Sequence, residues 1–156
     1  MDRLRLIVLA VSVGGGCLCS GSLQDTTRDV SIPESLHLGT VFADEEAVGV
    51  VEVRSTGTGA IEVTALSASG VAVDPVALPA RVGGGGVLPV TVRWMPGGVA
   101  TLDGFLDVTT DRAPATPKRV RITAAAVAVP ECDDGNTCTD DVFDRNRRRC
   151  VSTPHD

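Results

Sequence analysis

The body of the chain, from residue 36 to 129, alternates apolar and polar residues, and no long window shows the repeat of an amphipathic helix. In segment 88–94 an apolar residue occupies every even position. The same alternation predicts further strands at 36–42, 51–55, 61–65, 71–73, 102–108 and 120–126. A period of two is typical of strands that bury one face, so the pattern predicts an all-β body.

The spacing of these strands indicates which all-β fold they form. They follow one another at intervals of roughly 8–15 residues and are separated by glycine, proline and aspartate turns, which is typical of a sandwich. We therefore predict an immunoglobulin-like β-sandwich of about seven strands. Pro89 has no N–H to donate to a neighbouring strand, so we expect it at a sheet edge. No cysteine falls within 35–129, so the core must hold by burial alone.

The first 16 residues resemble a secretory signal peptide. Arg3 and Arg5 form a short positive region, and the apolar run 6–13 follows it. This run is too short to span a bilayer stably. The pattern predicts that the protein leaves the cytoplasm.

Cys17 follows three glycines, an arrangement that resembles the lipobox of bacterial lipoproteins. The resemblance implies that Cys17 is the lipid attachment site, although Gly14 stands where the family prefers leucine. Cleavage near 20–22, without lipid, is the alternative. Residues 17–34 are polar and are expected to form a tether. We predict a lipid-anchored protein of the bacterial cell envelope, in the outer membrane or at the cell surface, with free secretion as the alternative.

Four short segments of the body carry a more specific pattern. They are Leu38-Gly39-Thr40-Val41, then Val51 to Gly59, then Val90 to Pro96, and finally Val120 to Ala126. In this order they resemble the Abnormal-spindle/Hydin (ASH) type of immunoglobulin-like domain over residues 35–129. The chain departs from the family where Ser55 replaces asparagine and Trp94 replaces phenylalanine. The resemblance implies a binding and scaffolding module without catalytic residues.

The composition changes after Pro130, where a polar, cysteine-containing tail occupies 130–156. It resembles a single "CxDGNxCTxD" repeat of exported bacterial surface proteins, with Phe143 at or next to the place of the third family cysteine. The resemblance implies a small disulfide-bonded tail. The disulfide candidates are Cys132, Cys138, Cys150 and Cys19.

The number of cysteines bears on the anchor. Of the five cysteines, acylation of Cys17 leaves four, an even number that can pair completely. Cleavage after residue 22 also removes Cys19 and leaves three. The even count favours the lipoprotein interpretation.

The tail also contains side chains that suit calcium, a hard cation that prefers oxygen ligands. They are Asp133, Asp134, Asn136, Asp140 and Asp141. Their spacing does not fit an EF-hand loop. An acidic, solvated turn held by disulfides is the simpler interpretation, and no other cofactor is predicted.

Charge and residue types exclude several functions. The formal net charge is −6 and aromatic residues make up 3% of the chain, so nucleic-acid binding is not expected. The two histidines are His37 and His155, and neither stands in a nucleophile–base motif. The glycine run 83–86 lacks the lysine of a phosphate loop and is expected to be a connector. The basic run 145–149 is expected to be a solvated loop.

These observations predict a non-catalytic exported lipoprotein whose sandwich serves protein binding, adhesion or envelope scaffolding. Its partners would be the membrane, through the lipid, and another envelope or surface protein. Exposed edge strands offer a route to that protein partner. The alternative is a freely secreted, calcium-stabilised binding protein whose acidic, cysteine-rich tail is the functional end.

Overall fold

The computed structural model describes residues 26–112 and 116–154, which form strands and contain no helix. These residues therefore include no helix that is long and apolar enough to cross a membrane. The strands are β1 (Val30–Ser31), β2 (Ser35–Phe42), β3 (Ala47–Ser55), β4 (Ile61–Ser69), β5 (Ala72–Val73), β6 (Ala80–Val82), β7 (Val87–Trp94), β8 (Ala100–Thr110), β9 (Lys118–Val127), β10 (Thr139–Asp144) and β11 (Arg149–Pro154).

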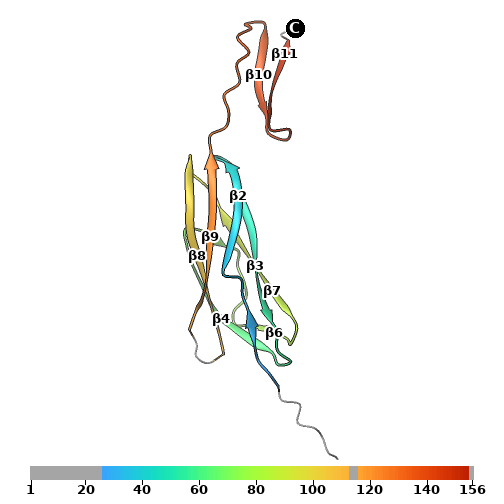
Figure 1. The fold of residues 1–156 in the computed structure, drawn as a ribbon, viewed down its shortest axis with the longest axis vertical. Helices are drawn as coiled ribbons and strands as arrows, with labels where there is room; N and C mark the ends of the chain where they lie inside the picture. The colour runs from blue at the N-terminus through green and yellow to red at the C-terminus, as the bar shows by residue number, and fades with distance from the viewer. Residues whose placement is uncertain (1–25, 113–115, 155–156) are drawn as a thin grey trace, which may run out of the picture.

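The predicted sandwich is confirmed. A four-stranded sheet with the order β1-β3-β7-β5 packs on a five-stranded sheet with the order β2-β9-β8-β4-β6. Every strand pair is antiparallel except β2 with β9, which is parallel. The hairpin β10–β11 lies beyond one end of the sandwich, and the described chain begins at the opposite end (Figure 1).

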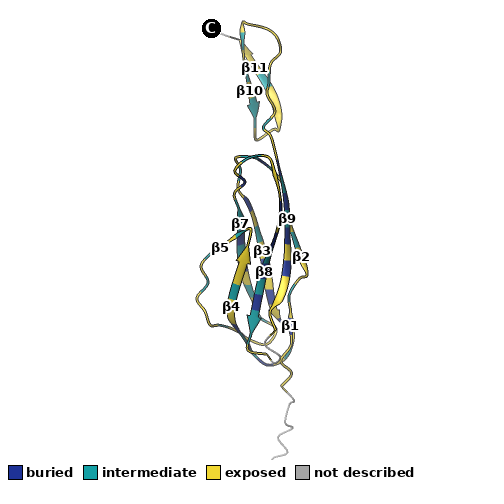
Figure 2. Cartoon of the chain, turned by 90° about the vertical axis from the view of Figure 1, so that its left-hand side faces the viewer, coloured by how far each residue is buried: buried dark blue, intermediate teal, exposed yellow. Residues whose placement is uncertain are grey.

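The core lies between the two sheets and is almost entirely aliphatic. Its fully buried side chains include Val51, Val53, Ile61, Val63, Val90, Val92, Leu106, Val108, Val120 and Ile122. Burying one such side chain stabilises a fold by about 1.5–3 kcal/mol, so the core needs no disulfide. Figure 2 shows the buried positions in the sandwich, whereas the hairpin β10–β11 contains no buried residue.

The chain changes sheets between β1 and β2. Val30 and Ser31 pair with Ser55 and Arg54 of β3, and the chain then crosses to pair β2 with β9 in the other sheet. Val30 is buried in the core, so two residues of the expected tether belong to the sandwich. Because β1 ends at Ser31, it covers only the last two residues of β3.

Ser55 closes the turn between β3 and β4. Its side chain is fully buried, and its hydroxyl donates a hydrogen bond of 3.0 Å to the carbonyl oxygen of Gly59. Within this turn, a Cβ on Gly57 would overlap the carbonyl oxygen of Thr27. Ser55, which stands where the ASH pattern has asparagine, thus forms its hydrogen bond within the turn. Position 57 requires glycine, because the backbone before β1 passes directly over the turn there.

Pro89 occupies an open stretch of β7, as its missing N–H predicts. It lies opposite Glu52 of β3, while β5 pairs only with Val92 and Arg93 on the other side of β7. Among the described strands none pairs with β7 beside Pro89 on that side. The proline therefore interrupts no ladder.

Candidate functional site

The described residues bring together no nucleophile, base and orienting group. His37 is exposed on β2 and is hydrogen-bonded through Nδ1 to the hydroxyl of Thr123 on β9 at 3.0 Å. His155 lies outside the described residues. Gly86 donates a 2.8 Å hydrogen bond to Gly83, so this glycine run closes a turn between β6 and β7.

The tail contains one disulfide, as expected. Cys132 is bonded to Cys150, and Cys138 is an exposed free thiol. The bond links the segment before β10 to the start of strand β11. Cys17 and Cys19 lie outside the described residues, so lipid attachment stays a prediction.

Cys138 has no disulfide partner among the described residues. Cys19, the remaining disulfide candidate, lies outside them, so its pairing stays a prediction. The even cysteine count therefore gives the anchor no support beyond the sequence.

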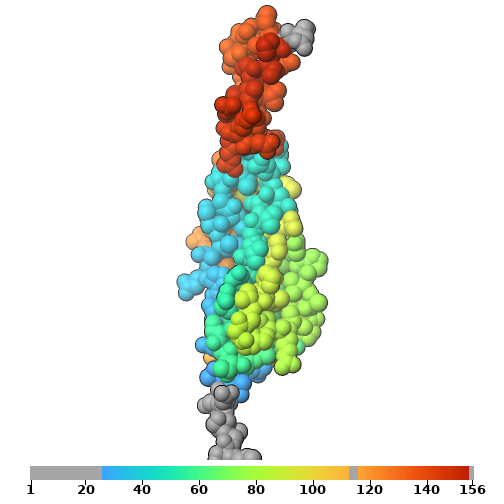
Figure 3. All heavy atoms as spheres, turned by 90° about the vertical axis from the view of Figure 1, so that its right-hand side faces the viewer, coloured from blue at the N-terminus to red at the C-terminus, as the bar shows by residue number. Residues whose placement is uncertain are grey.

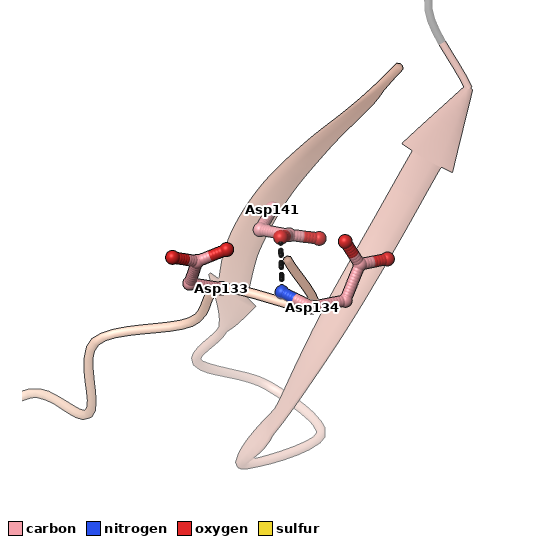
Figure 4. A group of neighbouring side chains, drawn as sticks. All are labelled: Asp133, Asp134 and Asp141. Carbon is pink, nitrogen blue, oxygen red and sulfur yellow. Dashed lines mark hydrogen bonds between the residues drawn. The ribbon is translucent and has the colours of Figure 1, made fainter. Parts of the chain in front are cut away.

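Three of the predicted calcium ligands gather in the tail. Asp133, Asp134 and Asp141 each offer an oxygen, and these oxygens lie within 4.8 Å of one another. Figure 4 shows the carboxylate of Asp141 between the other two, with one of its oxygens accepting a 2.6 Å hydrogen bond from the N–H of Asp134. The disulfide and the pairing of β10 with β11 bring these segments together.

The charge of this acidic cluster is not neutralised by a salt bridge. No described arginine or lysine forms an ion pair with the three carboxylates, and Oδ1 of Asp141 is buried without a hydrogen-bond partner. The N–H of Asn136 donates to Asp134 and is the main reason that the pKa of this carboxyl is lowered. Oδ1 of Asp141 is therefore an unused acceptor beside two further carboxylates.

The other two predicted ligands are placed differently. The amide oxygen of Asn136 accepts a 3.0 Å hydrogen bond from the N–H of Cys138. Asp140 precedes Asp141 on β10, and successive side chains of a strand point to opposite faces. Neither residue belongs to the group of three carboxylates.

The tail packs on the end of the sandwich through its basic turn. Phe143 contacts Phe42 edge-to-face, with ring centroids 5.2 Å apart. Arg145 donates two hydrogen bonds to Asp44, and the guanidinium of Arg148 lies 5.7 Å from the ring centre of Phe42. Phe143 therefore packs on the sandwich. The basic run, expected to be a solvated loop, makes part of this contact.

We expect Asp44→Asn to weaken the packing of the tail at neutral pH. Hydrogen bonds from Arg145 are the main reason that the pKa of Asp44 is lowered below 3.8. A lowered folded-state pKa means that this contribution is present above 3.8 and is lost as the pH falls through the folded value. The ring-proton NMR shifts of Phe143 should therefore move toward random-coil values in Asp44→Asn at pH 7, and in the wild type only in acid.

Asp103→Asn is the matched control, because it removes an exposed Asp–Arg pair that lies on the sandwich. It should leave the Phe143 shifts unchanged. Equal shifts in the two variants would show that the Asp44–Arg145 pair does not hold the tail.

The sandwich has an open strand edge along β3. The N–H of Ser55 donates to Gly86 beside β7, and the N–H of Thr56 donates to Asp29 on the β1 side. Because these directions alternate along an antiparallel strand, the N–H and C=O groups of Val48, Val50 and Glu52 point away from β7. No described strand pairs with them, because β1 ends opposite Arg54.

A groove of about 390 Å³ lies against this edge. Val50, Glu52 and Arg54 line one side, and Ser31, Pro33, Ser35 and Leu36 line the remainder. Figure 3 shows this face of the molecule, with β2 in blue beside β3 in turquoise. Val48 and Val50 are each about half exposed next to the groove. The open edge and this groove, together called the β3 groove below, combine unpaired backbone groups with apolar surface.

The outer face of β8 and β9 has a different character. Arg119 forms two hydrogen bonds to Asp107, Arg121 forms two to Asp103, and Arg119 also covers the ring of Phe105 at 3.9 Å. These arginine hydrogen bonds are the main reason that the pKa of each aspartate is lowered. Because β8 and β9 each pair with a strand on both sides, this face offers no open strand edge and is a weaker candidate for binding than the β3 groove.

Solved structures resemble the sandwich, although no protein-family model and no curated protein sequence matches the chain. The ASH/PapD-like domain 7 of human CEP192 has a TM-score of 0.54 and 14% identity, over 78% of this chain and 100% of that domain. A Porphyromonas gingivalis protein of unknown function has a TM-score of 0.54 and 15% identity, over 64% of this chain. The secreted serine protease VesC of Vibrio cholerae has a TM-score of 0.53 and 11% identity, over 65% of this chain.

The sandwich has the ASH/PapD-like immunoglobulin fold that the four sequence segments predicted. At identities of 11–15% the likeness shows the fold alone. The match covers 47% of the P. gingivalis protein and 24% of VesC, so this chain corresponds to only part of each.

Proposed function

We propose that this protein is a non-catalytic exported lipoprotein whose sandwich binds another envelope or surface protein. The open edge of β3 carries the proposal, because unpaired backbone groups beside exposed valines are a surface that a protein partner can complete. An anchor at Cys17 would hold the chain at the end where Thr26 lies. The tail would then point away from the membrane, and the β3 groove would lie along the side of the rod (Figure 1).

The intact mass of the protein from its own host tests the anchor. We expect a chain that begins at Cys17 and carries a diacylglyceryl group and an acyl chain, and that sediments with membranes. A lipid-free chain that begins near Leu23 would refute the anchor.

Cross-linking in intact cells tests the binding role. We expect a discrete adduct between this chain and a second envelope protein, identified by mass spectrometry. A chain that forms no adduct, although abundant in the envelope, would count against a binding function whether or not it is anchored.

Calcium binding by the tail is a second candidate, favoured by one observation. Oδ1 of Asp141 is buried without a hydrogen-bond partner among three neighbouring carboxylates, where a cation would neutralise the charge. Asp133, Asp134 and Asp141 would supply the oxygens. In this alternative the protein is secreted freely and the tail is its functional end.

Calcium at millimolar concentration should then slow amide exchange in β10 and β11, and chelation should reverse the effect. Asp141→Asn removes one charge and should abolish the response, whereas Asp144→Asn, outside the cluster, should retain it. Equal exchange rates with and without calcium would exclude this candidate.

A further inference from the structure

We propose that the β3 groove binds an extended segment of another protein, which adds a strand antiparallel to β3 in line with β1. This inference rests on the proposed binding function and names the site and the chemistry of the partner. Strand β1 already runs antiparallel to β3 and stops at Ser31, where Pro33 turns the chain away. The position that a longer β1 would occupy is the groove itself.

The backbone determines that the occupant is a strand. Val48, Val50 and Glu52 each present an N–H donor and a C=O acceptor at intervals of two residues. An extended peptide has the same spacing and satisfies all of them, whereas a helix has no free backbone groups to offer. About five residues of the partner would face residues 48–52 of β3.

The exposed side chains on this edge determine the partner's pattern. A residue opposite Glu52 lies beside an exposed carboxylate that Arg54 already contacts at 3.1 Å. An exposed carboxylate can accept from a second cation, so a lysine or arginine suits that place. Residues opposite Val50 and Val48 lie beside half-exposed valines, so apolar β-branched residues suit those places. Read along the partner, the pattern is basic, any, apolar, any, apolar.

A second copy of this chain does not provide that pattern. In a symmetric antiparallel pair of β3 edges, Glu52 faces Val48, Val50 or another Glu52, depending on the register. The register that places Arg54 opposite Glu52 is blocked, because Ser31 already pairs with Arg54. The net charge of −6 also makes two copies repel each other and attracts a basic partner.

The test adds the capped peptide Ser-Lys-Thr-Val-Thr-Val-Ser to the exported chain. Amide exchange of the protein, measured by NMR, reports binding. In the free chain the amides of Val48, Val50 and Glu52 should exchange fast, and those of Val51 and Val53 slowly. The peptide should slow the three edge amides severalfold. N-methylation of its central valine should weaken binding about tenfold, because that N–H donates to Val50. N-methylation of the threonine before it, whose N–H points away from β3, should change the affinity little.

Two variants of the protein test the same hydrogen bond from the side of β3. Val50→Pro removes an edge N–H and leaves the hydrogen bonds with β7 intact, so it should weaken peptide binding about tenfold. Val50→Thr keeps the N–H and the β-branched shape and should bind nearly as the wild type does. If Val50→Pro fails to fold, the pair of N-methylated peptides decides the question on the wild-type chain.

The outcomes separate this inference from the proposed function. Edge amides that stay unprotected by the peptide, or binding indifferent to both N-methyl groups, would overturn the strand-accepting groove. If the cross-linked adduct still formed in cells, the protein would bind its partner through another surface, and the proposed function would hold. Edge amides that are protected in the free chain and become exposed on dilution would identify a second copy as the occupant and overturn the proposed partner.

Discussion

Replacing Leu106 with alanine is expected to lower the free energy of unfolding by about 2–5 kcal/mol. Leu106 is fully buried on β8, which lies between β9 and β4 in the five-stranded sheet. It pairs with Val120 on one side and Ala68 on the other, so the cavity left by the side chain has ordered strands on both sides and cannot collapse easily. The loss is a large part of the 5–15 kcal/mol typical of a domain.

Chemical denaturation followed by Trp94 fluorescence measures this loss. Val99→Ala is the control, because Val99 is 70% exposed and its truncation should change stability by less than about 0.5 kcal/mol. Similar losses in both variants would mean that Leu106 is not part of a tightly packed core.

Cys150→Ser is expected to unfold the tail and leave the sandwich folded. The hairpin β10–β11 has no buried residue, and an isolated two-stranded hairpin is at best marginally stable. The Cys132–Cys150 bond closes a loop with a sequence separation of 18, which stabilises it by about 3 kcal/mol. Amide exchange in residues 131–154 should therefore become fast, while the melting of the sandwich stays nearly the same.

Cys138→Ser is the matched control, since Cys138 is exposed and outside the disulfide. It should leave the exchange of the tail unchanged. Peptide mapping should also find Cys138 alkylated before reduction, and Cys132 and Cys150 only afterwards. A tail that stays protected in Cys150→Ser would show that the contacts with Phe42 and Asp44 suffice to hold it.

The sandwich could be predicted from the sequence because a single physical pattern recurs through it. Segments such as 88–94 and 102–108 alternate apolar and polar residues, and each became one of the central strands β7 and β8. The hairpin of the tail could not be predicted in this way. In β10 the apolar residues Val142 and Phe143 are adjacent, and the contacts of Phe143 are with a residue about a hundred positions earlier.

The candidate sites show the same division between local pattern and spatial arrangement. The acidic composition of the tail indicated oxygen ligands, but only the disulfide and the strand pairing decide that Asp133 and Asp141 meet while Asp140 lies on the other face. The open edge of β3 depends on where β1 ends and on which direction each N–H points. No residue type between Ala47 and Val53 carries that information.

The parallel pairing of β2 with β9 has a mechanical consequence. The chain enters β2 from the side where the described chain begins and leaves β9 toward the tail (Figure 1), so tension along the rod pulls these neighbouring strands in opposite directions along their length. Their six residue pairs then bear the load together in shear. An antiparallel hairpin pulled at its open end would instead lose its hydrogen bonds one after another. A protein held at one end and pulled at the other is therefore built to resist force along its own axis.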